Sequence, residues 1–331
     1  MSQTPPVARP QQRVFGQYEI LSVLGKGGMA EVYRARVLSG PREGWTVALK
    51  RLLPALTADA ESVTLFAREA RLSKQLHHPN IVTVLDAGEL EGIYFIVMDL
   101  VDGRDLGQIL RRCKVRGIPL PLDFAVYLGK VLLEALAYAH TATGASGEPL
   151  GIVHCDVSPS NLFISRVGEI KLGDFGVSRV LVDGKLQEGE VLGKPYYLSP
   201  ESLRGEVSPE ADLWAATVVL YELLTLERPF TGATPEEVFQ AIRSGTYRPL
   251  RELRPEVPEA LEDVVRRAFS ARIDDRFPSA ESFAHALAPH YDERVGTPLA
   301  IAAVVRGLFG ASDDAPSTPQ GGAPPSPSRA S

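Results

Sequence analysis

The chain has 331 residues, 44% of them hydrophobic and 23% charged, which is typical of a globular protein with room for two packed lobes. No apolar run is long enough to cross a bilayer, and the first twenty residues lack the apolar core of a secretory signal, so we expect a cytoplasmic protein without a membrane span. A formal net charge of −6 without a long basic run argues against a nucleic-acid partner, and two cysteines are too few for a disulfide framework or a four-ligand zinc site.

The N-terminal part predicts a small unit rich in strands. Residues 1–13 contain much proline and glutamine, so we expect them to be disordered, with order beginning near Tyr18. β-branched and apolar residues are then enriched in five segments that predict strands: YEILSVL, AEVYRAR, WTVALKR, VLDAGEL and IYFIVMD. A helical stretch, FAREARLSKQLHHPNIV, lies between the third of these segments and the fourth.

The character of the sequence changes after Gly103. Apolar positions now repeat at helical spacing in LDFAVYLGKVLLEALAYAH, DLWAATVVLYELLTL, PEEVFQAIRSG and EALEDVVRRAFS. The segment PLAIAAVVRGLF predicts a short amphipathic helix within residues 294–310, which either packs on the larger lobe or docks a partner; we expect packing. Residues 311–331 are dominated by Ser, Pro, Gly and Ala, so we expect a disordered tail.

A glycine-rich turn joins the first two predicted strands. Gly25, Gly27 and Gly28 lie in LGKGGMAEVYRA, where the missing Cβ atoms would let backbone N–H groups approach phosphate oxygens closely. Glycine-rich turns also occur in unrelated hairpins, so this motif alone favours neither phosphate binding nor an ordinary turn. Lys50 at the end of the third strand and Glu69 on the helix follow it, and we expect them to pair, although such residues are usually solvated surface charges.

The most informative segment is HCDVSPSNLFIS, which places Asp156 five residues before Asn161. LGDFGVSR follows, with Asp174 at the head of a DFG triplet. With the glycine turn, these motifs resemble the bacterial eukaryotic-like (Hanks-type) serine/threonine protein kinases over about residues 18–290, with a catalytic loop similar to that of myxobacterial members. SPE, ending at Glu201, agrees with this, and Arg276 is the expected ion-pair partner of Glu201.

The resemblance implies an α+β, bilobal protein kinase fold. Its N-lobe, residues 14–98, would hold five antiparallel strands and one helix, and residues 99–103 would form the hinge. The C-lobe, residues 104–293, would be large and mainly helical.

The resemblance also assigns roles to the charged residues. ATP would bind with Mg²⁺, or with Mn²⁺ as the alternative ion, and Asn161 and Asp174 would supply the oxygen ligands. Lys50 would neutralise the α- and β-phosphates while Glu69 holds it in place. Asp156 would accept or orient the proton of the attacking hydroxyl.

The same resemblance implies a nucleotide pocket between the lobes. Its contacts would come from the glycine turn, apolar side chains, the hinge and a ribose-binding carboxylate: Leu24, Gly25, Lys26, Gly27, Gly28, Val32, Ala48, Lys50, Met98, Asp99, Val101, Asp105 and Phe163. For the apolar members, ordinary core packing explains the residue types equally well, and only the resemblance favours ligand contact.

Two departures from the family pattern concern the activation loop. Cys155 stands where many kinases have an arginine that binds a phosphorylated loop, and a thiol cannot make that bidentate contact. Between Asp174 and Ser199 there is no threonine, and only Ser178, Tyr196 and Tyr197 carry hydroxyls. We therefore expect a non-RD kinase whose activity does not depend on activation-loop phosphorylation. Cys155 itself is expected to be a small filler, since the neighbouring Asp156 raises the pKa of its thiol.

Another departure concerns the reacting phosphate. Ser158 replaces the lysine that normally follows the catalytic aspartate by two residues, and Lys194 replaces a threonine that normally contacts that lysine. We expect the Lys194 ammonium to occupy the vacated place beside Asp156. The alternative is an exposed lysine without a role, which is the usual state of surface lysines.

The resemblance leaves several functions open. The favoured function is a protein kinase that acts on serine or threonine hydroxyls of a protein substrate, with a regulatory protein partner as a further expectation. A nucleotide-binding pseudokinase that serves as a signalling scaffold is the alternative, which the substitutions at Cys155 and Ser158 keep open. A kinase for a small molecule agrees less well with the SPE segment and the helices after it.

Overall fold

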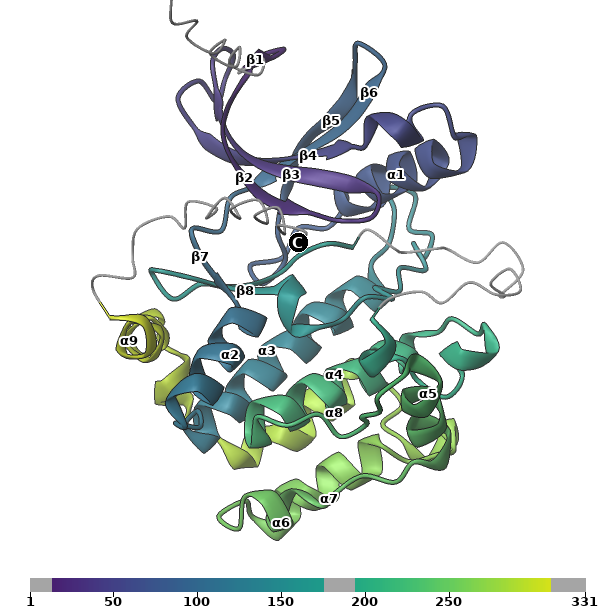
Figure 1. Cartoon of the computed structure of the whole chain (residues 1–331), viewed down its shortest axis with the longest axis vertical. Helices are drawn as coiled ribbons and strands as arrows, with labels where there is room; N and C mark the ends of the chain where they lie inside the picture. Colours follow the sequence, from purple (N-terminus) through teal and green to yellow (C-terminus); the bar gives the residue numbers. More distant parts are fainter. Residues whose placement is uncertain (1–13, 176–193, 311–331) are drawn as a thin grey trace, which may run out of the picture.

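The computed structural model describes residues 14–175 and 194–310. A β-sheet with one long helix forms the upper lobe in Figure 1, and the helical lobe lies below it. The predictions for residues 1–13 and 311–331, and for Ser178, fall outside the described residues. No helix in the described ranges is long and apolar enough to span a membrane.

The N-lobe is built on one antiparallel sheet with the strand order β1-β2-β3-β4-β6-β5. Its strands are β1 (Val14–Phe15), β2 (Tyr18–Lys26), β3 (Ala30–Val37), β4 (Thr46–Leu52), β5 (Val84–Leu90) and β6 (Ile93–Asp99). The five predicted strands are confirmed, and β1 is an addition that moves the start of the sheet from Tyr18 to Val14. A strand of two residues is too short to show alternation in the sequence. The position of β1 is instead fixed by tertiary packing, because Phe15 is only 6% exposed and its ring packs edge-on against Phe95.

Alternation along the strands sorts the side chains onto two faces. In β4, Val47 and Leu49 are buried in a core on one face of the sheet. Ala48 and Lys50 therefore point to the opposite face, where helix α1 (Ala60–Ser73) packs. Phe66 of α1 is 3% exposed and joins the apolar cluster there, which fixes the distance of the helix from the sheet.

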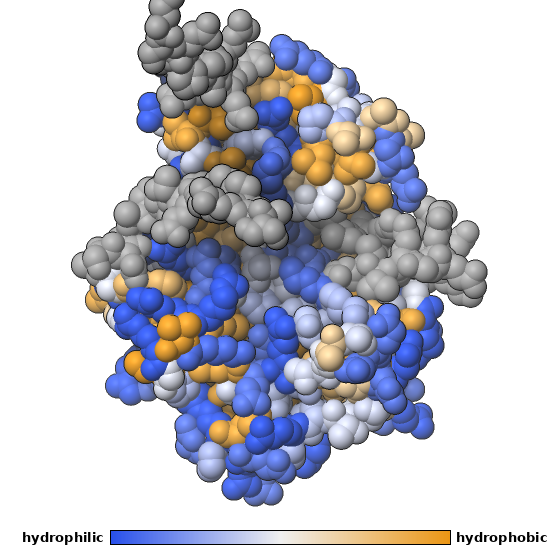
Figure 2. Space-filling view, in the orientation of Figure 1, coloured by the Kyte–Doolittle hydropathy of each residue, from blue (hydrophilic) through white to orange (hydrophobic). Residues whose placement is uncertain are grey.

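The C-lobe surrounds two central helices, α3 (Leu122–Thr141) and α4 (Pro209–Thr225), which pack against each other. Its other helices are α2 (Leu106–Arg116), α5 (Pro235–Ser244), α6 (Leu250–Leu253), α7 (Glu259–Ala268), α8 (Ala280–Leu287) and α9 (Pro298–Phe309). A small sheet of β7 (Gly103–Asp105), β8 (Leu162–Ser165) and β9 (Ile170–Leu172) lies at the top of this lobe. Strand β7 follows directly from the hinge. Figure 2 shows that the visible face of this lobe is mainly hydrophilic, broken by small hydrophobic groups.

A buried ion pair joins the segment before α4 to the segment between α7 and α8. Arg276 Nη1 and Nη2 donate to the two carboxylate oxygens of Glu201 at 2.7 and 3.0 Å, and both side chains are 1% exposed. The guanidinium also stacks over the ring of Trp214 at 4.8 Å. The expected pairing of these two residues is present, in a bidentate geometry that only arginine can make.

Helix α9 packs on the C-lobe beside α2. Arg112 Nε and Arg116 Nη1 of α2 each donate at 3.0 Å, to the carbonyls of Leu308 and Gly307, so guanidinium groups satisfy the end of α9. Gly168 faces the start of α9 so closely that a Cβ there would lie 1.9 Å from the carbonyl oxygen of Pro298. The structure thus shows α9 packed rather than projecting.

Candidate active site

A cavity of about 610 Å³ opens between the lobes, beneath the β2–β3 hairpin and beside the hinge. The residues that line it include most of the predicted nucleotide contacts: Leu24, Gly25, Val32, Ala48, Met98, Asp99, Val101, Asp105 and Phe163. Asp174, a predicted metal ligand, also lines it, whereas Lys26, Gly27, Gly28 and Lys50 do not. The turn itself is closed by a hydrogen bond from the Gly27 N–H to the Ala30 carbonyl at 2.8 Å, and Lys26 pairs with Glu31.

The cavity wall also contains residues that the sequence did not single out. Arg34 lies on β3 two positions after Val32, so strand alternation could have placed it on the same face. Asp102 of the hinge accepts a hydrogen bond from Arg34 at 2.9 Å and lies 3.5 Å from Arg166. No sequence pattern joins Arg34, Asp102 and Arg166, because these three residues come from β3, the hinge and the turn after β8.

Lys50 lies at the centre of a charged cluster behind the cavity. Its Nζ is 2.6 Å from Oε1 of Glu69 on α1 and 3.4 Å from Oδ1 of Asp174, which follows β9. The Lys50 and Glu69 side chains are 13% and 10% exposed, while that of Asp174 is 37% exposed. Burial lowers the pKa of Lys50, but the two carboxylates outweigh it and raise that pKa above its ordinary value. The lysine therefore remains a cation between Glu69 and Asp174.

A second cluster surrounds Asp156. The Asn161 side-chain amide donates to the Asp156 carbonyl at 2.8 Å and to its carboxylate Oδ2 at 2.9 Å, which fixes the aspartate within its loop. The backbone joins the two clusters, because the Gly173 N–H donates to the Asn161 carbonyl at 2.9 Å and Asp174 is the next residue. Residues from three distant parts of the chain thus meet on one side of the cavity.

The loop before Asp156 is held in a strained conformation by a buried aspartate. Asp212 of α4, 1% exposed, accepts hydrogen bonds from the backbone N–H groups of His154 and Cys155 at 2.7 and 2.9 Å. Cys155 has φ of 62°, in the left-handed region that non-glycine residues rarely adopt. The two hydrogen bonds stabilise this turn and so set the direction of the Asp156 side chain.

The Cys155 thiol is not activated. Burial raises its pKa most, and the carboxylates of Asp212 and Asp156 raise it further. The expected direction is correct, but burial and Asp212 contribute more than Asp156, the only cause that the local sequence suggested. A raised pKa leaves little thiolate at neutral pH.

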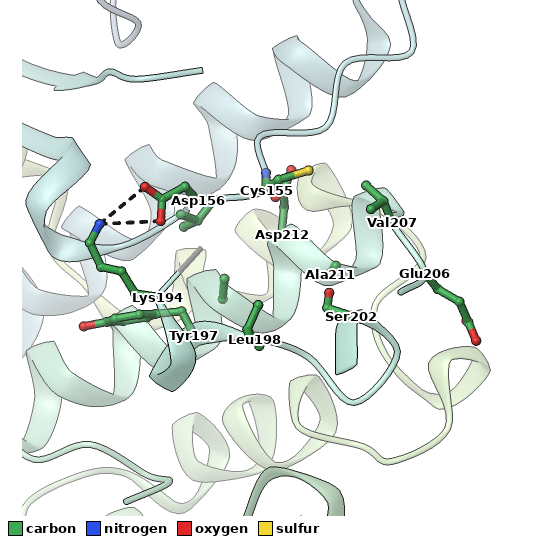
Figure 3. Close-up of a pocket in the computed structure, with 12 residues that line it drawn as sticks. Cys155, Asp156, Lys194, Tyr197, Leu198, Ser202, Glu206, Val207, Ala211 and Asp212 are labelled. Atoms are coloured by element: carbon green, nitrogen blue, oxygen red, sulfur yellow. Dashed lines mark hydrogen bonds and ion pairs between the residues drawn. The ribbon is translucent and has the colours of Figure 1, made fainter. Parts of the chain in front are cut away.

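Lys194, which lies 38 residues after Asp156, contacts the catalytic loop (Figure 3). Its Nζ donates to Ser158 Oγ at 2.7 Å and lies 3.4 and 3.5 Å from the two carboxylate oxygens of Asp156. Lys194 directly precedes a single 3₁₀ turn, Pro195–Tyr197, which is anchored by a 2.6 Å hydrogen bond from the Tyr197 hydroxyl to Glu222. An ammonium therefore lies beside Asp156, although its side chain is 43% exposed.

Of the two predicted metal ligands, Asp174 lines the cavity, whereas Asn161 is buried beside Asp156 and does not. The Asp174 carboxylate is the most exposed member of its cluster and faces the cavity. Asn161 commits its amide nitrogen to Asp156, so Oδ1, which accepts a hydrogen bond from Ser160, is the atom that would ligate a metal. Within the described ranges, no three His, Cys, Asp or Glu side chains form a closed metal site. This sparse oxygen set fits Mg²⁺, which usually takes its other ligands from phosphates and water.

Comparison with known proteins identifies relatives over most of the chain. Residues 18–288 match the protein kinase domain family. The tyrosine-protein kinase MasK of Myxococcus xanthus is 38% identical over 309 residues, which cover 91% of this chain and 47% of MasK. The serine/threonine-protein kinase PrkC of Bacillus subtilis is 34% identical over 272 residues, covering 82% of this chain and 40% of PrkC.

A solved structure agrees with the fold. The crystal structure of the Mycobacterium tuberculosis PknI kinase domain superimposes with a TM-score of 0.63 at 28% identity, covering 86% of this chain and all (100%) of that one. The chain spans less than half the length of the two curated relatives, 47% and 40%. The relatives therefore contain further segments that this chain does not match.

Proposed function

Because the chain belongs to the protein kinase family, we propose that it transfers the γ-phosphoryl group of ATP to a serine or threonine hydroxyl of a protein substrate. One observation carries the proposal. Lys50 contacts both Glu69 and Asp174 at the edge of a cavity large enough for a nucleotide. Relatives named serine/threonine-protein kinases support the choice of acceptor.

The cavity binds the nucleotide by its base, sugar and phosphates. Leu24, Val32 and Ala48 of the N-lobe cover one face of the adenine, and Phe163 covers the other. The hinge backbone at Asp99 and Val101 supplies its hydrogen bonds, Met98 closes the back, and Asp105 meets the ribose, each as the family pattern implies. Apolar walls with a few polar groups are typical of such sites.

The charged residues position the phosphates. Lys50, kept cationic and fixed by Glu69, interacts with the α- and β-phosphates. Asp174 and Asn161 would hold Mg²⁺, or Mn²⁺ as the alternative, which neutralises charge on the phosphate oxygens when bound. In such a site most of the rate gain comes from orientation and electrostatic stabilisation.

Asp156 orients the attacking hydroxyl and accepts its proton. Asn161 restrains its carboxylate through Oδ2, and the Lys194 ammonium supplies a positive charge next to it. We assign Lys194 the electrostatic role of the lysine that Ser158 replaces, because its Nζ is bonded to the Ser158 hydroxyl itself. A fixed cation near the transferring group stabilises the charge that develops there.

The activity is further proposed to be independent of activation-loop phosphorylation. Cys155 cannot bind a phosphate as an arginine would, and the loop before Asp156 is already held by Asp212. Most of the activation segment, residues 176–193, lies outside the described residues, so the support comes from the catalytic loop alone.

Two other readings have specific support. The substitutions at Cys155 and Ser158 keep open the alternative of a nucleotide-binding pseudokinase that acts as a scaffold. The name of the relative MasK favours tyrosine as the acceptor.

One experiment separates these readings. The full chain is incubated with labelled ATP, Mg²⁺ and a generic protein substrate, beside Asp156→Asn and the matched surface variant Asp263→Asn. We expect transfer by the wild type and by Asp263→Asn, since the latter residue is exposed on α7, and no transfer by Asp156→Asn. Nucleotide binding without transfer by any of the three proteins would favour the scaffold instead. Phosphoamino-acid analysis of the product then distinguishes serine and threonine from tyrosine.

A further inference from the structure

A second cavity, of about 150 Å³, lies between the small sheet β7–β8 and helix α9. It combines three guanidinium groups with apolar side chains. We call this site the arginine groove and define it by Arg104, Arg166, Arg306, Ile164, Val305 and Phe309. A basic site with an apolar floor fits a short acidic peptide segment.

The end of α9 is fixed at this groove. The Phe309 ring packs under the guanidinium groups of Arg104 and Arg112, at 5.1 and 5.6 Å from the ring centroid. The helix ends at Gly310, which has φ of 76°, so the chain leaves α9 directly beside the groove. Whatever follows Gly310 begins within reach of the three arginines.

The sequence that follows is acidic. Asp313 and Asp314 come three and four residues after Gly310, and the remainder of the chain to Ser331 contains a single basic residue, Arg329. Three residues of extended chain span about 10 Å. This is enough for a carboxylate to reach a groove that begins at Phe309.

The groove shares a wall with the nucleotide cavity. Gly103, Arg104 and Arg166 line both cavities. Arg166 also lies 3.5 Å from Asp102, which pairs with Arg34 of the N-lobe across the mouth of the nucleotide cavity. A carboxylate bound in the groove therefore changes the charge at the entrance for a polyphosphate.

We propose that the acidic segment 312–314 binds the arginine groove of its own chain through Asp313 and Asp314, and thereby weakens the binding of Mg-ATP in the adjacent cavity. Charge complementarity and the exit point of the chain select this occupant over a second copy or a separate acidic protein. The binding of the segment is independent of the proposed function, whereas its effect on ATP rests on it.

The test uses the full chain with Asp313→Asn/Asp314→Asn and, separately, Arg306→Gln. Arg306 belongs to the groove but not to the nucleotide cavity, so its loss does not remove a nucleotide contact. The control is Arg272→Gln, at an arginine that is 77% exposed and outside the groove. The first readout, amide hydrogen exchange of residues 302–310, needs no nucleotide; the second is the Kd for a fluorescent ATP analogue with Mg²⁺.

We expect both groove variants to accelerate this exchange and to lower the Kd by about two- to fivefold, the effect of one or two partly exposed ion pairs. Combining them should give no further change, because each removes the same interaction. The differences in exchange and in Kd between these variants and the wild type should shrink in high salt and should be independent of protein concentration.

Unchanged exchange in the Asp313→Asn/Asp314→Asn protein would overturn the proposal. Faster exchange with an unchanged Kd would refute its inhibitory part, and dependence on protein concentration would assign the groove to a second copy. Absence of nucleotide binding in all proteins would instead contradict the proposed function, while the exchange result would still decide whether the segment binds.

Discussion

Lys194 Nζ donates a 2.7 Å hydrogen bond to Ser158 Oγ, so the ammonium of Lys194 lies directly beside the residue that stands where the sequence pattern has a lysine. The same ammonium is 3.4 Å from Oδ2 of Asp156. Two departures from the family pattern, 36 residues apart in the sequence, are thus in direct contact.

We expect Lys194→Ala to lower kcat by about 10- to 100-fold with little change in the KM for ATP, because the charge acts on the transferring group. Lys74→Ala, at an exposed lysine of the N-lobe, should have no effect. The double variant Ser158→Lys/Lys194→Thr, which restores the family arrangement, should recover most of the lost turnover. Normal steady-state turnover by Lys194→Ala would rule the role out.

Glu69→Gln tests the charge cluster through the protonation of Lys50. The raised pKa of Lys50 means that the stability from its ion pairs is fully present below the ordinary value of 10.5 and is lost only as pH rises through the higher folded pKa. Without Glu69, burial lowers this pKa, and more of the neutral amine forms in mildly alkaline buffer. We therefore expect an amine-reactive reagent to acylate Lys50 faster in Glu69→Gln than in the wild type. Mass spectrometry of the modified residue measures the two rates. Equal rates in both proteins would contradict the assigned cause.

Arg276→Ala should lower the free energy of unfolding by about 3–5 kcal/mol, since it leaves the Glu201 carboxylate buried without its partner. Arg204→Ala breaks an exposed pair with Glu206 and should cost less than about 1 kcal/mol. Urea unfolding measures both. The double variant Glu201→Gln/Arg276→Met should be less destabilised than Arg276→Ala, because no charge is left buried; a larger loss would show that the pair itself is the main source of stability.

Phosphatase treatment should leave kinase activity unchanged, because Cys155 offers no cation for a phosphorylated activation loop and Asp212 already fixes the catalytic loop. The measurement is initial rate before and after treatment, with mass spectrometry to confirm removal of phosphate. Loss of activity, together with a phosphate mapped to residues 177–198, would disprove this independence.

The local pattern was sufficient for the longer elements but not for all of them. Helical spacing predicted α3, α4, α5, α7 and α9 of the C-lobe, and β-branched enrichment predicted five strands of the N-lobe sheet. Helices α2, α6 and α8 and the short strands β7–β9 were not predicted. Strand β1 was missed because two residues carry no period, and its position depends on Phe15 meeting Phe95 across the sheet. Arg34, Asp102 and Arg166 were missed because their network exists only between segments.

The sequence by itself determined which chemical groups this protein has and their order: a lysine on a strand, a glutamate on a helix, and an aspartate, an asparagine and a second aspartate in loops. Periodicity and residue type are local properties, so they can be read along the chain. Only the tertiary structure decided which charges interact, as with Lys50 and Asp174, 124 residues apart, because electrostatic energy depends on distance in space and on burial. For the same reason the hydrogen bond from Lys194 to Ser158, and the position of α9 beside the cavity that shares a wall with the nucleotide cavity, became visible only in the folded chain.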